Sequence, residues 1–216
     1  MGDAFGEGGT IGGMTSPDGP WLVVGLGNPG PEYARTRHNV GHMTIDVLAR
    51  RASARLTAHR TGTHVAEVRL GTLPGGVPGP RVVLATSDSY MNTSGGPVGR
   101  LARFLGIGAE HLLVLHDDLD LPAHELRLKK GGGEAGHNGL RSISQVLGTR
   151  DYTRLRIGIG RPPGHQDPAA YVLAPITQRD MGEWDVTLEL AADVVEDVVL
   201  RGFAEAQQTL HSPHDQ

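Results

Sequence analysis

Polar side chains that can move a proton stand in three places along this chain. Asn28 and His38 follow an apolar run, His116–Asp120 is an acidic run behind a second one, and Gly131–Gly139 is glycine-rich and holds a His-Asn pair. An imidazole titrates near neutral pH, so it can take a proton from water, and a carboxylate such as Asp117 would fix its tautomer and stabilise the imidazolium. We therefore predict general-base chemistry at His38 and expect the three places to form one site.

A nucleotide site is the first alternative. Gly25–Gly30 fits the G-x-G-x-x-G pattern of dinucleotide-binding turns and follows an apolar run. Pro29 and Pro31 flank the last glycine, so several amides that would donate to a pyrophosphate are missing or restricted. Asp46, at the spacing of a ribose-binding acid, falls inside a predicted helix. We therefore expect no nucleotide cofactor.

A metal site is the second alternative. His38 and His42 are four residues apart, as in a helical zinc pair, and the residues 116–120 with His137 would add ligands. The residues between the two histidines lack the general-base Glu of such motifs, and Gly41 weakens a helix. Without a fixed ligand spacing we expect no metal.

Two further polar segments stand at predicted helix starts. Asn92 lies just before a glycine-bearing helix start, where its amide can donate to a carbonyl oxygen that gains negative charge. Ser94 is interpreted as the N-cap of that helix. His137 and Asn138 begin another helix and suit a phosphate or a polar chain end, while a plain glycine loop is the alternative interpretation of Gly131–Gly139.

The elements that must position these residues are indicated by apolar periodicity. Strands alternate with helices and no linker or repeat divides the chain, which predicts a single α/β domain with a largely parallel sheet. In the last helix, Leu190, Val194 and Val198 are expected on the buried side. The predicted strands are 21–26, 64–70, 81–86, 112–115, 125–129 and 155–159, and the predicted helices are 40–56, 94–105, 138–147 and 184–200.

Composition narrows the function classes. The 216 residues are 38% hydrophobic and contain no Cys, which excludes disulfides, thiolate metal sites and a Cys nucleophile. No apolar run reaches the about 18 residues of a membrane helix, and residues 1–20 lack the features of a secretory signal, so we expect a cytoplasmic protein. The glycine-rich residues 1–20 are interpreted as a flexible N-terminal tail, residues 21–210 as the domain and 211–216 as a C-terminal tail.

The charge distribution is uneven although the net charge is only -4. From His124 to Arg161 eight Lys or Arg stand against three acids, whereas from Pro162 onward two Arg stand against ten acids. A local basic strip can attract phosphates in one place on an acidic protein. A solvated basic face is the alternative.

Five blocks occur in order: GLGNPGPEYARTRHNVG, YMNTSG, HDDLDLP, GGGEAGHNGLRS and RLRIGIGRP. Together they resemble bacterial-type peptidyl-tRNA hydrolase from about Trp21 to the region of Pro175. The resemblance implies a monomeric, metal-free enzyme without cofactor that hydrolyses the ester joining a peptide to the 3′ ribose of tRNA. The fold it implies is a phosphorylase/hydrolase-like α/β domain with a twisted mixed sheet and flanking helices.

The resemblance also implies roles for individual residues. His38 would be the general base for water, Asp117 would support it, and Asn28 would distinguish an N-blocked peptide from a free aminoacyl group. The substrate-binding residues would be Tyr33, Tyr90, Asn92 and Asn138, and those holding tRNA phosphate Arg127, Lys129 and Arg156.

Two rival functions stay open from sequence. One is an RNA-binding module on the same fold that does not hydrolyse its ligand, and the other is a nucleotide-dependent enzyme using Gly25–Gly30. The presence of His38, Asp117 and the three asparagines favours catalysis, because an ester can be cleaved by one activated water without a covalent nucleophile.

Overall fold

In the computed structural model, residues 19–212 are described, and they form a seven-stranded sheet in the order β2-β3-β6-β1-β7-β9-β8. The four central strands β6, β1, β7 and β9 are parallel, and the strands at both edges are antiparallel to their neighbours. The predicted α/β domain with a mixed, largely parallel sheet is confirmed. The strands are β1 Trp21–Gly25, β2 Thr57–His59, β3 Thr63–Arg69, β6 Arg81–Ser87, β7 Leu112–Asp118, β8 Leu126–Lys130 and β9 Thr153–Gly158, with a separate hairpin of β4 Thr72–Leu73 and β5 Val77–Pro78.

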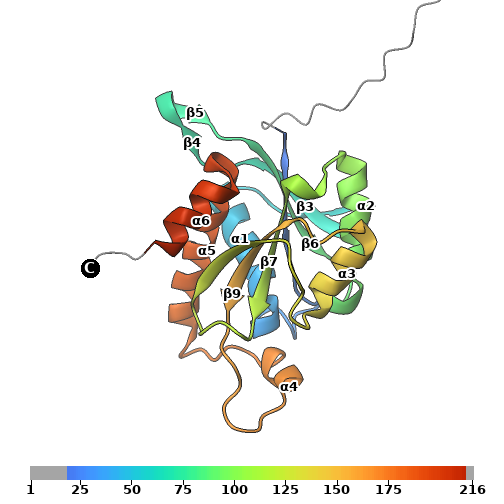
Figure 1. Ribbon diagram of the computed structural model, residues 1–216, viewed down its shortest axis with the longest axis vertical. Coiled ribbons are helices and arrows are strands. Elements are labelled where there is room, and N and C mark those ends of the chain that lie inside the picture. Colours follow the sequence, from blue (N-terminus) through green and yellow to red (C-terminus); the bar gives the residue numbers. More distant parts are fainter. Residues whose placement is uncertain (1–18, 213–216) are drawn as a thin grey trace, which may run out of the picture.

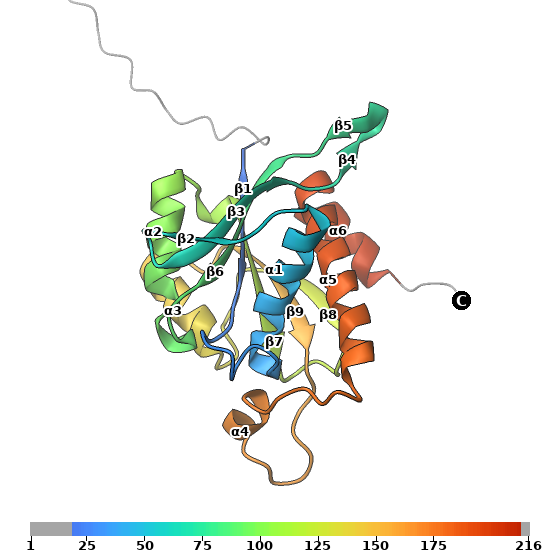
Figure 2. The same ribbon diagram turned by 180° about the vertical axis from the view of Figure 1, so that it is seen from behind.

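Helices cover both faces of this sheet (Figures 1 and 2). Two helices pack on one face, α2 Gly95–Leu105 and α3 Asn138–Leu147. Three pack on the other face, α1 Val40–Arg51, α5 Met181–Arg201 and α6 Phe203–His211. The short α4, Pro168–Val172, lies beyond one end of the sheet, and the β4–β5 hairpin projects at the opposite end (Figure 1).

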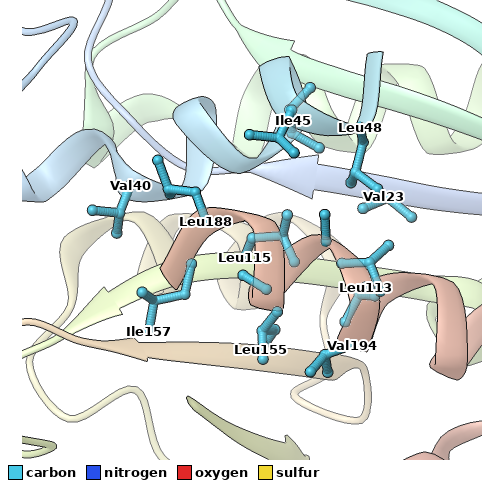
Figure 3. Packing of buried hydrophobic residues seen from close by; sticks show 14 of the residues in the cluster. Val23, Val40, Ile45, Leu48, Leu113, Leu115, Leu155, Ile157, Leu188 and Val194 are labelled. Carbon is cyan, nitrogen blue, oxygen red and sulfur yellow. The ribbon is translucent and has the colours of Figure 1, made fainter. Parts of the chain in front are cut away.

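The larger core lies between the sheet and the pair α1 and α5 (Figure 3). Alternate residues of the central strands point into it, among them Val23, Leu113, Leu115 and Leu155, and all four are fully buried. The intervening residues face α2 and α3 instead. Because both faces are covered, β1, β6 and the first four residues of β7 are apolar almost throughout, which is why the sequence signals them clearly. β9 instead alternates apolar residues with Arg154 and Arg156.

Several predicted boundaries are wrong for local reasons. The helix predicted over 40–56 ends at Arg51, because the chain turns away at Ser53, where φ is +50°. β7 continues past Leu115 to Asp118, since pairing with β9 keeps its polar end in the sheet. Leu190 is 51% exposed rather than buried with Val194 and Val198, because 3.6 residues per turn carry a strict spacing of four off the buried stripe.

The proposed tails fall largely outside the described residues. Residues 1–18 and 213–216 are not described, so the N-terminal tail 1–20 is represented only by its last two residues. His211, the first residue of the predicted C-terminal tail, belongs to α6, and its Nε2 accepts a hydrogen bond from the Leu128 amide at 3.2 Å. Within residues 19–212 no helix is long and apolar enough to cross a membrane.

Candidate active site

The predicted site residues meet where the parallel strands end. Because the carboxyl ends of parallel strands share one edge of a sheet, the segments after β1, β6 and β7 are brought together there. A cavity of about 960 Å³ opens at this edge. Its lining includes Asn28, Tyr33, His38, Tyr90, Asn92, Asp117, His137 and Asn138, with residues of the α4 segment on the far side.

The start of α1 reaches this edge through a close contact of glycines. A Cβ on Gly25 would lie 2.3 Å from the carbonyl oxygen of Gly41, and a Cβ on Gly41 would lie 2.4 Å from that of Leu115. Any side chain at either position would push the helix off the strands. The short 3-10 turn η1, Arg37–Asn39, precedes the helix, so this contact sets how near His38 comes to β7.

One carboxylate oxygen joins two histidines at the base of the cavity. Asp117 Oδ1 lies 2.9 Å from His38 Nδ1 and 2.9 Å from His137 Nε2. Since the carboxylate only accepts, both nitrogens carry protons. His137 Nδ1 is then an acceptor, and it takes the Leu140 amide at 3.4 Å as the N-cap of α3. The lone pair of His38 is therefore left on Nε2, where it can accept a proton.

The protonation of this pair follows from its surroundings. Burial would lower the pKa of His38, but the charge and hydrogen bond of Asp117 outweigh it, so the pKa lies above the ordinary 6.5. Burial would raise the pKa of Asp117, but the two histidines hold it well below its usual range. Asp117 is therefore ionised at neutral pH, and His38 is a base strengthened by its neighbour.

A third histidine, His116, packs beside His137 but is not bonded to the carboxylate of Asp117. His116 is buried, and its Nδ1 lies 2.7 Å from the carbonyl oxygen of Asp117. Burial, together with the neighbouring His137, lowers the pKa of His116 to about 3, so it is neutral at neutral pH. Its ring packs edge-on against that of His137 at a centroid distance of 5.0 Å. His116 is therefore an uncharged ring that packs against His137.

Asn28 is held in one orientation. Its side-chain Oδ1 accepts the Met91 amide at 2.8 Å, which fixes the direction of the amide group. Asn39 binds the main chain of Asn28 in both directions, accepting its N–H and donating to its carbonyl, each at 2.9 Å. The end of the Asn28 side chain that remains for a ligand is the Nδ2 donor.

The predicted substrate-binding residues line the cavity mouth. Asn92 lies in the 3-10 turn η3, Met91–Thr93, and Asn138 is the first residue of α3, and both are exposed. Tyr33 is half-buried and meets the 58% exposed Tyr90 edge to face at 6.4 Å. Exposed donors and aromatic faces at the mouth suit a ligand that enters from solvent.

The three predicted phosphate-binding residues lie together on one face of β8 and β9. Arg127 pairs directly with Arg156 across these strands, and Lys129 is two residues further along β8. Two of them are already ion-paired: Arg127 with Glu125 at 2.6 Å and Arg156 with Asp118 at 2.8 Å. We call Arg127, Lys129 and Arg156 the basic strip. Within the described residues Lys129 makes no ion pair, so its charge is the most available of the three.

One interpretation of a single motif is wrong, and two alternatives that the sequence already disfavours do not match the structure. Ser94 does not cap α2 with its side chain, because the preceding η3 turn directs its hydroxyl to the Tyr90 carbonyl at 3.3 Å. No helix follows Gly25–Gly30 at once, since α1 begins only at Val40, so the dinucleotide arrangement does not form. The half-buried His42 ring lies against Gly27, and His42 is not in the group of ligand atoms that gathers around His38.

One group of residues has the composition of a metal site. His38, Asp117 and His137 each offer a ligand atom, and these atoms lie within 4.8 Å of one another. Both histidine nitrogens already donate to Asp117, so a cation here would have to displace the two protons. The geometry suits a proton network, and we derive no metal chemistry from it.

Three contributors were not predicted from sequence. The sequence indicates a helix start at His137 but not its hydrogen bond to Asp117, and it indicates no function for Asn39 or for the Met91 amide. Asn39 directly follows His38 in the first block and Met91 directly precedes Asn92 in the second, so each lies beside a predicted residue. Their hydrogen bonds cross between segments, and only the folded arrangement reveals them.

Comparisons with known proteins agree with this geometry. A family model described as peptidyl-tRNA hydrolase matches residues 22–216. The chain is 58% identical over 193 residues to the peptidyl-tRNA hydrolase of Kineococcus radiotolerans, covering 89% of this chain and 98% of that one, and 52% identical over 199 residues to that of Frankia alni, covering 92% and 98%. A crystal structure of peptidyl-tRNA hydrolase from Acinetobacter baumannii superposes with a TM-score of 0.79 at 32% identity, covering 92% of this chain and 97% of that one.

Proposed function

Because the chain belongs to the peptidyl-tRNA hydrolase family, and is thereby an enzyme that hydrolyses peptidyl-tRNA, we propose that His38 is its general base. The observation that carries this proposal is the carboxylate oxygen of Asp117 shared by two histidines. It leaves Nε2 of His38 with a lone pair in the cavity. General-base catalysis by one such group is worth about 10²–10⁴-fold.

The reaction then follows in two proton transfers. His38 Nε2 removes a proton from water as the water oxygen bonds to the ester carbonyl carbon, and the imidazolium that forms is stabilised by ionised Asp117. When the tetrahedral intermediate collapses, the bond to the ribose 3′ oxygen breaks, and the same proton passes from His38 to that oxygen. The products are a tRNA with a free 3′ hydroxyl and a peptide carboxylic acid, which releases its remaining proton to solvent at neutral pH, so His38 and Asp117 end as they began.

The carbonyl oxygen gains negative charge in the intermediate. Asn92 and Asn138 line the same cavity from two different segments, and each carries amide N–H donors. Donors arranged before the reaction stabilise such an oxyanion without reorganisation. We assign Asn92 and Asn138 to the oxyanion and the adjoining peptide, with Tyr33 and Tyr90 as packing faces for the substrate.

Asn28 would read the blocked amino group. Its Oδ1 is occupied by the Met91 amide, so Nδ2 can only donate. A peptide bond or an N-acetyl group offers a carbonyl oxygen that accepts this hydrogen bond, whereas the free ammonium of an aminoacyl-tRNA has only donors. The site therefore favours the N-blocked substrate, because the ammonium would leave the Asn28 donor facing another donor.

The basic strip would hold the tRNA backbone. Arg127 and Lys129 are exposed on the edge strand β8, where a phosphate can approach from solvent. Arg156 is only 25% exposed, and its guanidinium is ion-paired with Asp118, so it is less accessible to a phosphate. Phosphate contacts position the nucleic acid and make its affinity depend on salt.

We further propose that residues 21–210 act as a monomeric, metal-free domain in the cytoplasm. All residues assigned to the reaction come from one copy of the chain, so a second copy is not needed to complete the site. Light scattering at working concentrations tests the monomer, since a mass of twice 22.9 kDa would contradict it. Retained activity in the presence of a chelator tests the metal-free reaction.

The decisive experiment is hydrolysis of N-acetyl-aminoacyl-tRNA with EDTA present, followed as release of the N-acetyl amino acid. We expect rapid release, with the unblocked aminoacyl-tRNA largely intact. Binding of this substrate without turnover would instead support the RNA-binding module. A matched assay with His38→Ala separates catalysis from binding.

A further inference from the structure

A buried arginine lies beneath the glycine segment that leads to the active site. Arg154 of β9 is 1% exposed. Its Nη1 donates to the carbonyl of Gly133 at 2.8 Å and its Nη2 to that of Gly132 at 2.9 Å, and the guanidinium lies 4.7 Å from the Tyr152 ring centroid. No ion pair within residues 19–212 includes it. A permanent cation is thus buried among main-chain carbonyls, and two of its strongest contacts go to one segment.

That segment, residues 131–136, has little stability of its own. Gly131, Gly132 and Gly136 have φ of +66°, +81° and +79°, and Ala135 has φ of +48°, so the chain takes conformations that most residues avoid. Glu134 of this segment also pairs with Arg150, and the two side chains are 13% and 61% exposed. Because the arginine lies in solvent, this pair contributes little. The Arg154 fork is therefore the principal buried side-chain anchor of the segment.

The far end of the segment carries reacting groups. Residues 134–138 line the cavity, and His137 both donates to Asp117 and accepts the Leu140 amide. The hydrogen bond from His137 to Asp117, at 2.9 Å, fails if the segment shifts by about 1 Å, since N–H···O bonds span only about 2.7–3.2 Å. The place of His137 and Asn138 thus depends on how the segment before them is held.

We propose that Arg154 is a positioning residue that fixes segment 131–136 and thereby holds His137 on Asp117 and Asn138 at the cavity mouth. This inference rests on the proposed function, since it concerns the same site. Arg154 belongs to the basic stretch from His124 to Arg161 and lies directly opposite Lys129 across β8 and β9. Unlike Arg127 and Lys129, however, it is buried and donates to main-chain carbonyls. It acts on catalysis and contributes no phosphate contact.

The first test replaces Arg154 by Lys, which keeps the positive charge but cannot donate to the carbonyls of Gly132 and Gly133 from two nitrogens at once. We expect kcat to fall by about 10- to 100-fold, because small misplacements of reacting groups cost this much. If His137 no longer donates to Asp117, the carboxylate interacts with His38 alone and stabilises its imidazolium more strongly. The acid limb of the pH profile of kcat/KM should therefore move to higher pH. The salt slope of tRNA binding should stay unchanged. The proposal would be overturned if Arg154→Lys kept the wild-type kcat and the wild-type acid limb. It would also be overturned if this variant kept the wild-type kcat but its tRNA affinity depended less on salt.

A second pair of variants leaves Arg154 in place. Gly132→Ala strains a left-handed residue whose Cβ would lie 2.9 Å from Lys129 Cε, whereas Gly133→Ala meets open space at an ordinary φ. We expect Gly132→Ala to reproduce the shifted acid limb and Gly133→Ala to match wild type. Equal behaviour of the two variants would contradict the proposal even if Arg154→Lys does not fold.

Histidine titration by NMR separates this inference from the proposed function. The pKa of His38 can be followed without substrate, so it reports on the Asp117 network whether or not the protein hydrolyses the ester. We expect a higher His38 pKa in Arg154→Lys and Gly132→Ala than in wild type. An unchanged His38 pKa in both variants would contradict the role of Arg154, and an inactive wild type would contradict only the proposed function.

Discussion

The proposed catalytic cluster, His38, Asp117 and His137 at the strand ends, and the basic strip on β8 and β9 differ in how their polar groups are held. The side chains of His38 and Asp117 are 14% and 3% exposed, and each has its orientation set by another protein group. Arg127 is 46% exposed, and no described acid pairs with Lys129. Buried, mutually bonded groups are costly to disturb, whereas water and salt ions replace exposed charges easily. The cluster should therefore determine the rate, and the strip should adjust affinity.

The largest expected effect is on the cluster. His38→Ala removes the general base, so hydrolysis of N-acetyl-aminoacyl-tRNA should fall by about 10²–10⁴-fold in single-turnover assays. Binding of tRNA should be preserved, because His38 is not part of the basic strip. A wild-type rate in this variant would remove His38 from the mechanism, and a parallel loss of binding would erase the distinction between cluster and strip.

An intermediate effect is expected on the choice of substrate. Asn28→Asp keeps an oxygen for the Met91 amide but replaces the Nδ2 donor by an acceptor, which suits an ammonium better than a carbonyl. A mispaired hydrogen bond costs about 1–3 kcal/mol, so the preference for blocked over free aminoacyl-tRNA should narrow by about 10- to 100-fold. The ratio of the two kcat/KM values measures this. An unchanged ratio would place the discrimination elsewhere.

Smaller effects are expected on the basic strip. Arg127→Ala and Lys129→Ala should each reduce the slope of log affinity against log salt by about 0.7–0.9, with kcat near wild type. Arg156→Ala is a contrasting variant, because it also leaves the buried carboxylate of Asp118 without its partner and should lower the melting temperature. Salt-independent binding by the wild-type protein would exclude the strip as a tRNA contact.

The sequence predicted the central strands better than the peripheral elements. β1, β6 and the first four residues of β7 are apolar on both faces and gave strong signals. β2 is three largely exposed residues, and α4 is five residues in a proline-rich stretch, so neither shows a period. α6 begins directly after Gly202, and its apolar stripe is limited to Phe203, Ala206 and Leu210, of which only Ala206 is buried. Short exposed elements depend on contacts that the local sequence does not record.

The site was predicted residue by residue but not as a network. Asn28, His38 and Asp117 stand in distinctive blocks near strand ends, and the geometry of a parallel sheet brings such blocks together. The sharing of Asp117 Oδ1 by His38 and His137 joins positions 79 and 20 residues from it in sequence. Counting the basic residues from His124 to Arg161 also overestimates the positive charge available to a ligand, because Arg154 is buried and Arg127 and Arg156 are ion-paired. Pairing and burial are properties of the folded chain.

The acid limb of the pH–rate profile of Asp117→Asn tests the central claim most directly. In wild type the carboxylate holds the pKa of His38 above 6.5, so single-turnover hydrolysis should increase with pH through a midpoint above that value as His38 becomes neutral. In Asp117→Asn the burial of His38 remains but the opposing charge is gone, so the midpoint should fall below 6.5 while the plateau rate decreases. A midpoint that stays in place or moves upward would contradict the account.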